Sequence, residues 1–463
     1  MGIGYAYYIW FHNKHYVCAS GIVTVCYNAY HVMAQTLVYI KLPAIHRIAV
    51  KEIHGMSTTM DEMEQDTEEC ISNGKQAADD SITKGQGENG QRKWPFYWKL
   101  VLLLAILDLI LNILARIPVV CDIYTDHIFW IWTETYGRIT GIFPISVGEI
   151  LLILAISYVL IWLFSLILFI FLHKKTGYRK YIQKYSKSVL AFGLFVLLIM
   201  TLNCSMLYGC SKLNINGHRS VEYTASDIQQ LWNHVAEQCN RLAWEVDRDG
   251  QGRPVYHGDL DEAVQHAMQN LSSDYNRFRG WYPHPKPIHF SYTMYQANCT
   301  GVYFPFSMEA NYNTYLSDLS YGATVAHELS HLKGYIYEDE ADFMAYLACI
   351  GSEEPYLQYS GYLSVLGYLQ SDYLDTEPDM EQGVRLLEQV YADSEEYTYT
   401  DDTYQEIADK EMAFNQETVE TFQETVETVS DGITDTYMNY YDATPNYAEV
   451  TKLMLAYYDG VLY

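Results

Sequence analysis

The residues with the clearest chemical meaning form one run, His327-Glu328-Leu329-Ser330-His331. In an α-helix, residues four apart lie one turn above each other, so two imidazoles at this spacing converge on a single metal ion. The intervening glutamate is then placed to act as a general base towards a zinc-activated water. The spacing therefore predicts a zinc hydrolase site, with His327 and His331 as metal ligands and Glu328 as the catalytic base.

The residues around this run favour a half-buried helix that ends soon after His331. Small and apolar residues precede the run, and Leu329 and Leu332 lie on a different face from the two histidines. Gly334 follows three residues after His331, where a left-handed glycine commonly ends a helix. The chain should then turn back into a second helix, over residues 337–348, which opens with acidic residues.

That second helix is the expected source of a third ligand, since catalytic zinc usually has three protein ligands. A third histidine in the HExxHxxGxxH spacing would fall at Tyr337, so a carboxylate is the better candidate. Glu338 and Asp342 share a helical face, which lets Glu338 bind metal while Asp342 orients a ligand histidine. Glu340 points about 200 degrees away from Glu338. We favour Glu338 and keep Glu340 as the alternative, since acids in a first helical turn need no metal to explain them.

Charge and hydropathy divide the chain of 463 residues into three parts. Residues 1–95 are mixed, residues 96–209 are strongly apolar with basic clusters, and residues 210–463 hold 12 Lys and Arg against 42 Asp and Glu. Nucleic-acid binding needs a basic face, so this composition excludes nucleic acid as a partner. We predict an N-terminal segment, a transmembrane region and an external domain with these boundaries.

Three stretches are apolar and long enough to cross a lipid bilayer as helices: residues 97–117, 149–172 and 189–208. The densest basic patch, residues 173–187, lies between the second and third spans and is predicted to be cytoplasmic. An odd number of crossings then places residues 210–463 outside the cell. Asp108 and Asn112 lie one turn apart inside the first span, and a helix-to-helix hydrogen bond explains them most simply.

The first 95 residues fit this scheme least well. Residues 16–40 are apolar but interrupted by polar side chains, which makes them a weak candidate for a fourth span. Residues 56–93 are polar and read as a disordered segment. Met56 and Met60 are alternative starts, in which case the leading residues would not be native.

Residues 210–463 are expected to form a mainly helical domain with a small sheet. Hydrophobic spacing predicts helices and strands in turn before the HExxH run: helices over 226–247 and 259–279, then strands over 288–292 and 300–305. A sheet ahead of the motif helix is the usual order in zincins. The predicted fold class is therefore a membrane protein with three transmembrane helices followed by a mainly helical α+β, zincin-like extracellular domain.

Five short parts of the sequence form a specific combination: residues 300–311, the His-Glu-x-x-His-x-x-Gly run, residues 338–343, residues 359–363 and the loop over 141–149. Together they resemble a bacterial domain-of-unknown-function family of multi-pass membrane proteins. The resemblance covers roughly residues 96–463. It implies three transmembrane helices, an external HExxH domain and, by motif, a zinc metallopeptidase of unstated substrate. Members of that family have Asn where this chain has Asp342, and a neutral amide orients a histidine differently from a carboxylate.

The expected function is a membrane-anchored zinc metallopeptidase of gluzincin type, which cleaves a peptide or protein substrate of the envelope or extracellular space and uses Zn²⁺ as its cofactor. The strand near Tyr303 could pair with an extended substrate, and Glu309 and Asn311 could contact its backbone or terminus. A turn after Pro305 explains Glu309 and Asn311 equally well. A tyrosine could donate to the oxyanion, with Tyr359 and Tyr362 as candidates.

Two rival functions stay open. A non-catalytic envelope receptor or scaffold could keep the zincin fold, although such a protein need not retain Glu328. An intramembrane protease would need the HExxH run inside a membrane span, whereas this run is preceded by Ser317-Asp318 and followed by Lys333.

Overall fold

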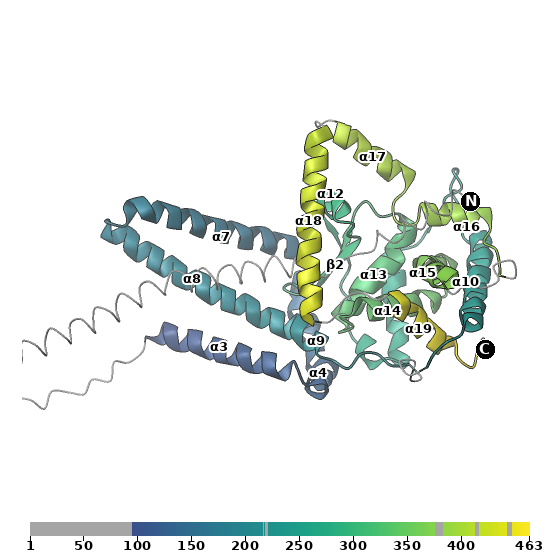
Figure 1. Ribbon diagram of the computed structural model, residues 1–463, viewed down its shortest axis with the longest axis horizontal. Helices are drawn as coiled ribbons and strands as arrows, with labels where there is room; N and C mark the ends of the chain where they lie inside the picture. The colour runs from purple at the N-terminus through teal and green to yellow at the C-terminus, as the bar shows by residue number, and fades with distance from the viewer. Residues whose placement is uncertain (1–94, 216, 218–220, 376–382, 413–415, 442–446) are drawn as a thin grey trace, which may run out of the picture. The chain divides into compact units, whose positions relative to one another are not determined.

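A computed structural model describes residues 95–463 apart from residues 216, 218–220, 376–382, 413–415 and 442–446 (Figure 1). The predictions of a weak fourth span, a disordered segment and alternative starts within residues 1–94 lie outside the described residues. Residues 106–463 belong to one compact unit.

Three long apolar helices precede the acidic region. They are α3 (Phe96–Leu114), α7 (Val147–Leu172) and α8 (Thr176–Met200), the last continuing through the π-helical turn η4 (Thr201–Ser205) and α9 (Met206–Tyr208). Each is long and apolar enough to cross a membrane. The third helix starts at Thr176 rather than at residue 189, because the basic residues predicted as a loop form its first turns. Only residues 173–175 connect α7 to α8.

Polar side chains join the long helices where apolar contacts alone would leave their register loose. Tyr158 donates to Ser188 Oγ at 2.7 Å, and Trp162 donates to Ser186 Oγ at 3.0 Å, which holds α7 beside α8 (Figure 1). The predicted helix-to-helix hydrogen bond of the first span is confirmed. Thr201 Oγ1 donates to Asp108 Oδ1 at 2.7 Å and accepts from Asn112 Nδ2 at 2.9 Å.

The connection between α3 and α7 is a chain of short helical turns. It comprises α4 (Pro118–Tyr124), η2 (Thr125–Phe129), α5 (Trp130–Trp132), η3 (Thr133–Gly137) and α6 (Arg138–Thr140). This connection packs against the acidic region, since Tyr136 donates to Pro305 O at 3.0 Å and Thr140 Oγ1 donates to Ser307 O at 2.7 Å. The chain leaves this connection along α7 and returns along α8 before it enters the acidic region. The connection and the acidic region therefore lie at the same end of this helix pair.

The acidic region is mainly helical. Its helices are α10 (Ala225–Glu245), α11 (Leu260–Asn270), α12 (Ser291–Gln296), α13 (Asp318–Leu332), α14 (Glu338–Ile350), α15 (Pro355–Asp375), α16 (Glu388–Glu395), α17 (Asp401–Met412), α18 (Gln416–Tyr441) and α19 (Tyr447–Tyr458). Helices α10, α13, α14 and α15 pack around a core that includes Leu329, Tyr346 and Leu363 (Figure 1). The predicted helix over 259–279 ends at Asn270 and gives way to 3₁₀ turns.

A small mixed sheet lies beside α13, with strands β1 (Lys286–Ile288), β2 (Gly301–Phe304) and β3 (Glu309–Asn313) in the order β1-β3-β2. Strand β3 pairs parallel with β1 and antiparallel with β2, where Gly301 lies opposite Tyr312. The predicted strand over 300–305 is confirmed as β2. The predicted strand over 288–292 is wrong beyond Ile288, because Ser291 Oγ donates to Ile288 O and the chain turns into α12.

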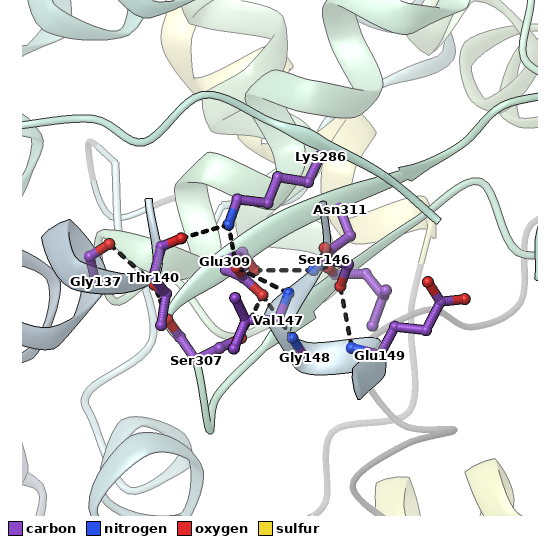
Figure 2. A network of polar contacts seen from close by, with 11 residues as sticks. Gly137, Thr140, Ser146, Val147, Gly148, Glu149, Lys286, Ser307, Glu309 and Asn311 are labelled. Atoms are coloured by element: carbon purple, nitrogen blue, oxygen red, sulfur yellow. Dashed lines mark hydrogen bonds and ion pairs between the residues drawn. The ribbon is translucent and has the colours of Figure 1, made fainter. Parts of the chain in front are cut away.

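A buried carboxylate ties this sheet to the first turn of α7 (Figure 2). Glu309 is 1% exposed and accepts from Val147 N at 3.2 Å and from Gly148 N at 2.7 Å, at a helix N-terminus that favours negative charge. Lys286 forms an ion pair with Glu309 and donates to Thr140 O at 2.7 Å. The sheet, the connection over 118–146 and the start of α7 are therefore held together by one ion pair and its hydrogen bonds.

Candidate metal centre

Helix α13 carries the HExxH run and has well-defined ends. Ser317 caps its N-terminus by accepting from Ser320 N. At the other end Gly334 has a φ of 91°, so the predicted left-handed glycine turn is confirmed. The imidazoles of His327 and His331 lie one turn apart on this helix, with ring centroids separated by 4.7 Å.

The turn after Gly334 brings the first residue of α14 back to the two histidines. Glu338 Oε2 lies 3.0 Å from His327 Nε2 and 3.6 Å from His331 Nε2. One donor atom from each of the three residues lies within 4.8 Å of the other two. The structure therefore brings together the three side chains that the sequence predicted as ligands.

The unpaired polar atoms of the site test whether a metal ion fits these residues. His331 Nε2, Glu338 Oε1 and Glu328 Oε2 are buried and have no hydrogen-bond partner among the described residues. Buried polar atoms are normally satisfied, so three unsatisfied ones at one point need an explanation. Two imidazole nitrogens and a carboxylate form the His₂Glu set that binds catalytic zinc. The donor set therefore fits Zn²⁺.

Each ligand histidine is held by a hydrogen bond at its other nitrogen. His327 Nδ1 lies 2.7 Å from Asp342 Oδ1, and His331 Nδ1 donates to Tyr335 O at 2.7 Å. An imidazole that donates from Nδ1 presents an unprotonated Nε2 when neutral. Both rings thus turn Nε2 towards Glu338. A hydrogen bond at the ring nitrogen that does not bind metal is the usual way in which a histidine ligand is oriented.

Burial and neighbouring charge shift the protonation of the site. Burial lowers the pKa of His327, but the carboxylates of Asp342 and Glu338 outweigh it and raise that pKa well above its ordinary value. For Glu338, burial is outweighed by His331 and His327, which hold the pKa below its ordinary value. Without a metal ion, the carboxylates of Asp342 and Glu338 therefore favour a proton on His327.

Glu328 lies on the same helix and is 2% exposed. Burial raises the pKa of Glu328 to about 7, against the opposing effect of the two imidazoles. Strand β2 passes directly over this side chain, because a Cβ on Gly301 would lie 2.6 Å from Glu328 Oε1. The position and environment of this carboxylate suit a general base, whose optimal pKa lies near the working pH.

Glu340, the alternative ligand, lies elsewhere. Its Oε1 accepts from Leu213 N at 2.5 Å, so its carboxylate is bonded to the segment that follows α9. The 200-degree separation along α14 accounts for this, since Glu338 and Glu340 face opposite sides of the helix. Among the described residues, the group of three potential ligands includes Glu338 and not Glu340.

The residues suggested for substrate contact are buried and bonded elsewhere. Tyr303 packs near the His331 ring, at 6.1 Å between centroids, and its hydroxyl donates to Asn203 O at 3.4 Å. Glu309 is engaged in the ion pair with Lys286, so its carboxylate is not available to a substrate in this structure. Asn311 is 1% exposed and donates to Val302 O at 3.2 Å.

The two tyrosines of α15 likewise point into the core. Tyr359 donates to Asp393 Oδ2 at 2.7 Å, and Asp393 pairs with Arg248 at 2.8 Å. The ring of Tyr362 packs against Tyr346, with centroids 5.7 Å apart. Among the described residues, no hydrogen bond joins either tyrosine to His327 or His331, so this geometry offers no support for an oxyanion donor on α15.

Sequence reasoning missed Gly301, the Tyr335 carbonyl and Lys286. A strand glycine commonly marks close approach of another group, which was the available signal for Gly301. A lysine between two prolines, Pro285 and Pro287, gave no signal of a buried ion pair. A backbone carbonyl gives none at all.

The chain belongs to the family described as "Protein of unknown function (DUF3810)", which matches residues 124–455. This range includes α7, α8, the sheet and both helices of the site. No curated protein and no solved structure matches the chain. The family carries no assigned activity, so a functional assignment has to be argued from the site.

Proposed function

We propose that this chain is a membrane-anchored zinc metallopeptidase that hydrolyses peptide bonds of an envelope or extracellular substrate. One observation carries the proposal: His327, His331 and Glu338 converge through α13 and α14, with Glu328 on the same helix as the two histidines. Their types and spacing match the ligands and base of a gluzincin-type site. We further propose a zincin-like fold for residues 210–463, with that region on the outer side of the membrane.

His327 Nε2, His331 Nε2 and a carboxylate oxygen of Glu338 would hold the ion. Bound zinc supplies a Lewis acid that acidifies a ligated water and polarises a carbonyl oxygen. Asp342 and the Tyr335 carbonyl keep the two rings in the tautomer that presents Nε2. Glu328 takes a proton at its unpartnered Oε2 and can return it to the leaving amine.

Solvent reaches the site only in part. His327, Glu338 and Asp342 keep 15%, 12% and 22% of their side-chain surface exposed, whereas His331 keeps 1%. A substrate would approach past the first turns of α14. This limited access also favours a second candidate function, a non-catalytic receptor or scaffold that keeps the metal site for stability.

The test uses the full chain in detergent, because the connection over 118–146 packs on the acidic region. Zinc content is measured by mass spectrometry, and cleavage of a diverse peptide library is compared with that by Glu328→Gln. Stoichiometric zinc in both proteins, with cleavage by the wild type alone, supports the metallopeptidase. Zinc without cleavage in either protein supports the scaffold, and absence of zinc from the wild type overturns both.

A further inference from the structure

A cavity of about 420 Å³ opens between the connection over 118–146 and the acidic region. Its walls include Trp130 from the connection, Arg277 and Arg279 from the segment after α11, and Lys333 from the end of α13. Two acids, Asp126 and Glu134, complete its charged lining. Three cations against two acids make this lining net positive.

A cavity lining with net positive charge is unusual for this chain. Two other cavities of the described residues, of about 740 Å³ and about 510 Å³, are lined by carboxylates and by no Lys or Arg. The formal net charge of the chain is −28. A cationic cavity in such a chain is therefore a local feature, not a consequence of overall composition.

Both acids of the cavity are already bonded. Asp126 accepts from Arg277 Nε at 2.7 Å. Glu134 accepts from Arg138 at 2.6 Å and from Trp281 N at 2.6 Å. Arg138 thus adds a fourth positive charge behind the cavity wall. The surrounding charge is positive after both carboxylates are paired.

Two of the cations are held in place. Arg277 stacks on Tyr335, with its guanidinium carbon 5.3 Å from the ring centroid. Lys333 is 7% exposed and donates to Arg279 O and Trp281 O at 2.9 Å and 3.0 Å. Arg279 is exposed at the cavity. The site thus combines fixed charges in its wall with one arginine in contact with solvent.

The connection that forms one wall joins two candidate membrane spans, α3 and α7. Only three residues separate the end of α3 at Leu114 from the start of α4 at Pro118, and six separate α6 from α7. Exposed large apolar side chains of this connection include Val119, Ile128, Trp130, Ile142 and Phe143. An apolar surface between two membrane spans is covered by lipid, and tryptophan favours the headgroup level.

From this geometry we propose that the cavity binds the phosphate of an anionic lipid headgroup, in the leaflet that faces the acidic region. Arginine donors match phosphate oxygens, the buried Lys333 ammonium adds positive charge in the wall, and Trp130 places the cavity rim where headgroups lie. Leu332 and Lys333, which directly follow His331, form part of the wall. A bound headgroup would therefore touch the end of the helix that carries the HExxH run. The proposal does not depend on zinc or on hydrolysis.

The experiment measures binding of short-chain phosphatidylglycerol and phosphatidylcholine to the full chain in a neutral detergent by calorimetry. We expect preference for phosphatidylglycerol. Arg279→Gln should weaken that binding about five-fold. This fold-change corresponds to about 1 kcal/mol, the contribution of one cation near an anionic surface. Arg385→Gln is the matched control, because it removes an exposed arginine of the same acidic region away from the cavity. Neither change should alter phosphatidylcholine binding.

Three outcomes would overturn the proposal. They are equal affinity for the two lipids, equal effects of Arg279→Gln and Arg385→Gln, and binding of inorganic phosphate as tight as that of phosphatidylglycerol. The last result would assign the cavity to a soluble anion. The exposure of Arg279 makes misfolding an inadequate explanation for a selective loss, and a thermal unfolding scan of each variant checks this.

Discussion

Gly301 and Glu328 are in contact across the junction of β2 with α13, and any side chain at residue 301 would displace the carboxylate. A Cβ there would lie 2.6 Å from Oε1, 2.8 Å from Cγ and 3.0 Å from Cδ of Glu328. The strand therefore bounds the position of the proposed base on this side. A substitution at Gly301 can therefore disturb the position of Glu328 while leaving the three metal ligands in place.

Gly301→Ala should lower peptide hydrolysis by about 100-fold, since a misplacement of about 1 Å costs that much in a positioned catalytic group. Zinc content should stay stoichiometric, because the three ligands lie on α13 and α14. Steady-state cleavage and metal analysis on the same preparation measure both. Gly432→Ala in α18 is the control, because an added Cβ there would meet no neighbouring atom within 4 Å, and it should leave activity unchanged. Full activity of Gly301→Ala would show that β2 does not constrain Glu328.

Asp342→Ala should weaken zinc binding by about 10-fold to 100-fold, because His327 would lose the acceptor that holds its tautomer. Asp342→Asn keeps an acceptor oxygen without the charge, so its loss should be smaller. Competition against a chelating dye measures both affinities, with exposed Asp274→Ala as the control. Equal affinities for wild type and Asp342→Ala would refute an orienting role for this carboxylate.

The ion pair of Lys286 and Glu309 should be strongly coupled. Glu309→Gln leaves a buried lysine without its counter-charge, and loss of one partner of such a pair costs about 3–5 kcal/mol of stability. Lys286→Met together with Glu309→Gln should recover part of that loss. Thermal unfolding of the single and double variants in detergent forms a double-mutant cycle. Additive effects of the two substitutions would contradict the contact seen in Figure 2.

Glu134 should make folding sensitive to acid. Burial raises the pKa of Glu134, but hydrogen bonds from Trp281 N and Arg138 outweigh burial and lower that pKa below its ordinary 4.5. A carboxyl group with a lowered folded pKa adds stability above the unfolded pKa, and this stability is lost as the pH falls through the folded value. The destabilisation by Glu134→Gln should therefore be largest near neutral pH and shrink below about pH 4.5.

Melting temperatures of the zinc-free protein at several pH values test this dependence. Glu353→Gln, which removes an exposed carboxylate, is the control and should show little change. A constant difference between Glu134→Gln and wild type at all pH values would mean that the contribution is not electrostatic.

The sequence predicted the parts of the fold that depend on local spacing. Apolar length identified the long helices, four-residue spacing identified α13, and Gly334 identified its end. Helical spacing favours Glu338 over Glu340, because Glu338 shares a face with Asp342 and Glu340 points about 200 degrees away, a purely local argument.

Contacts between distant segments escaped prediction. Strand β3 was not recognised, because Glu309, Asn311 and Asn313 are polar although all three are buried. Their burial is compensated by partners from elsewhere in the chain, such as Lys286 for Glu309 and Cys299 O for Asn313. Only the folded arrangement reveals such partners, since they follow no period in the sequence.

The packing of residues 118–146 onto the acidic region means that the region bearing α13 does not hang from a flexible tether. In the proposed membrane-anchored arrangement, the helix pair α7 and α8 would set the distance of this region from the lipid. A hydrolase mounted this way would meet its targets by lateral diffusion within the bilayer plane. Under the proposed function, juxtamembrane stems of neighbouring proteins would be the envelope substrates within easiest reach.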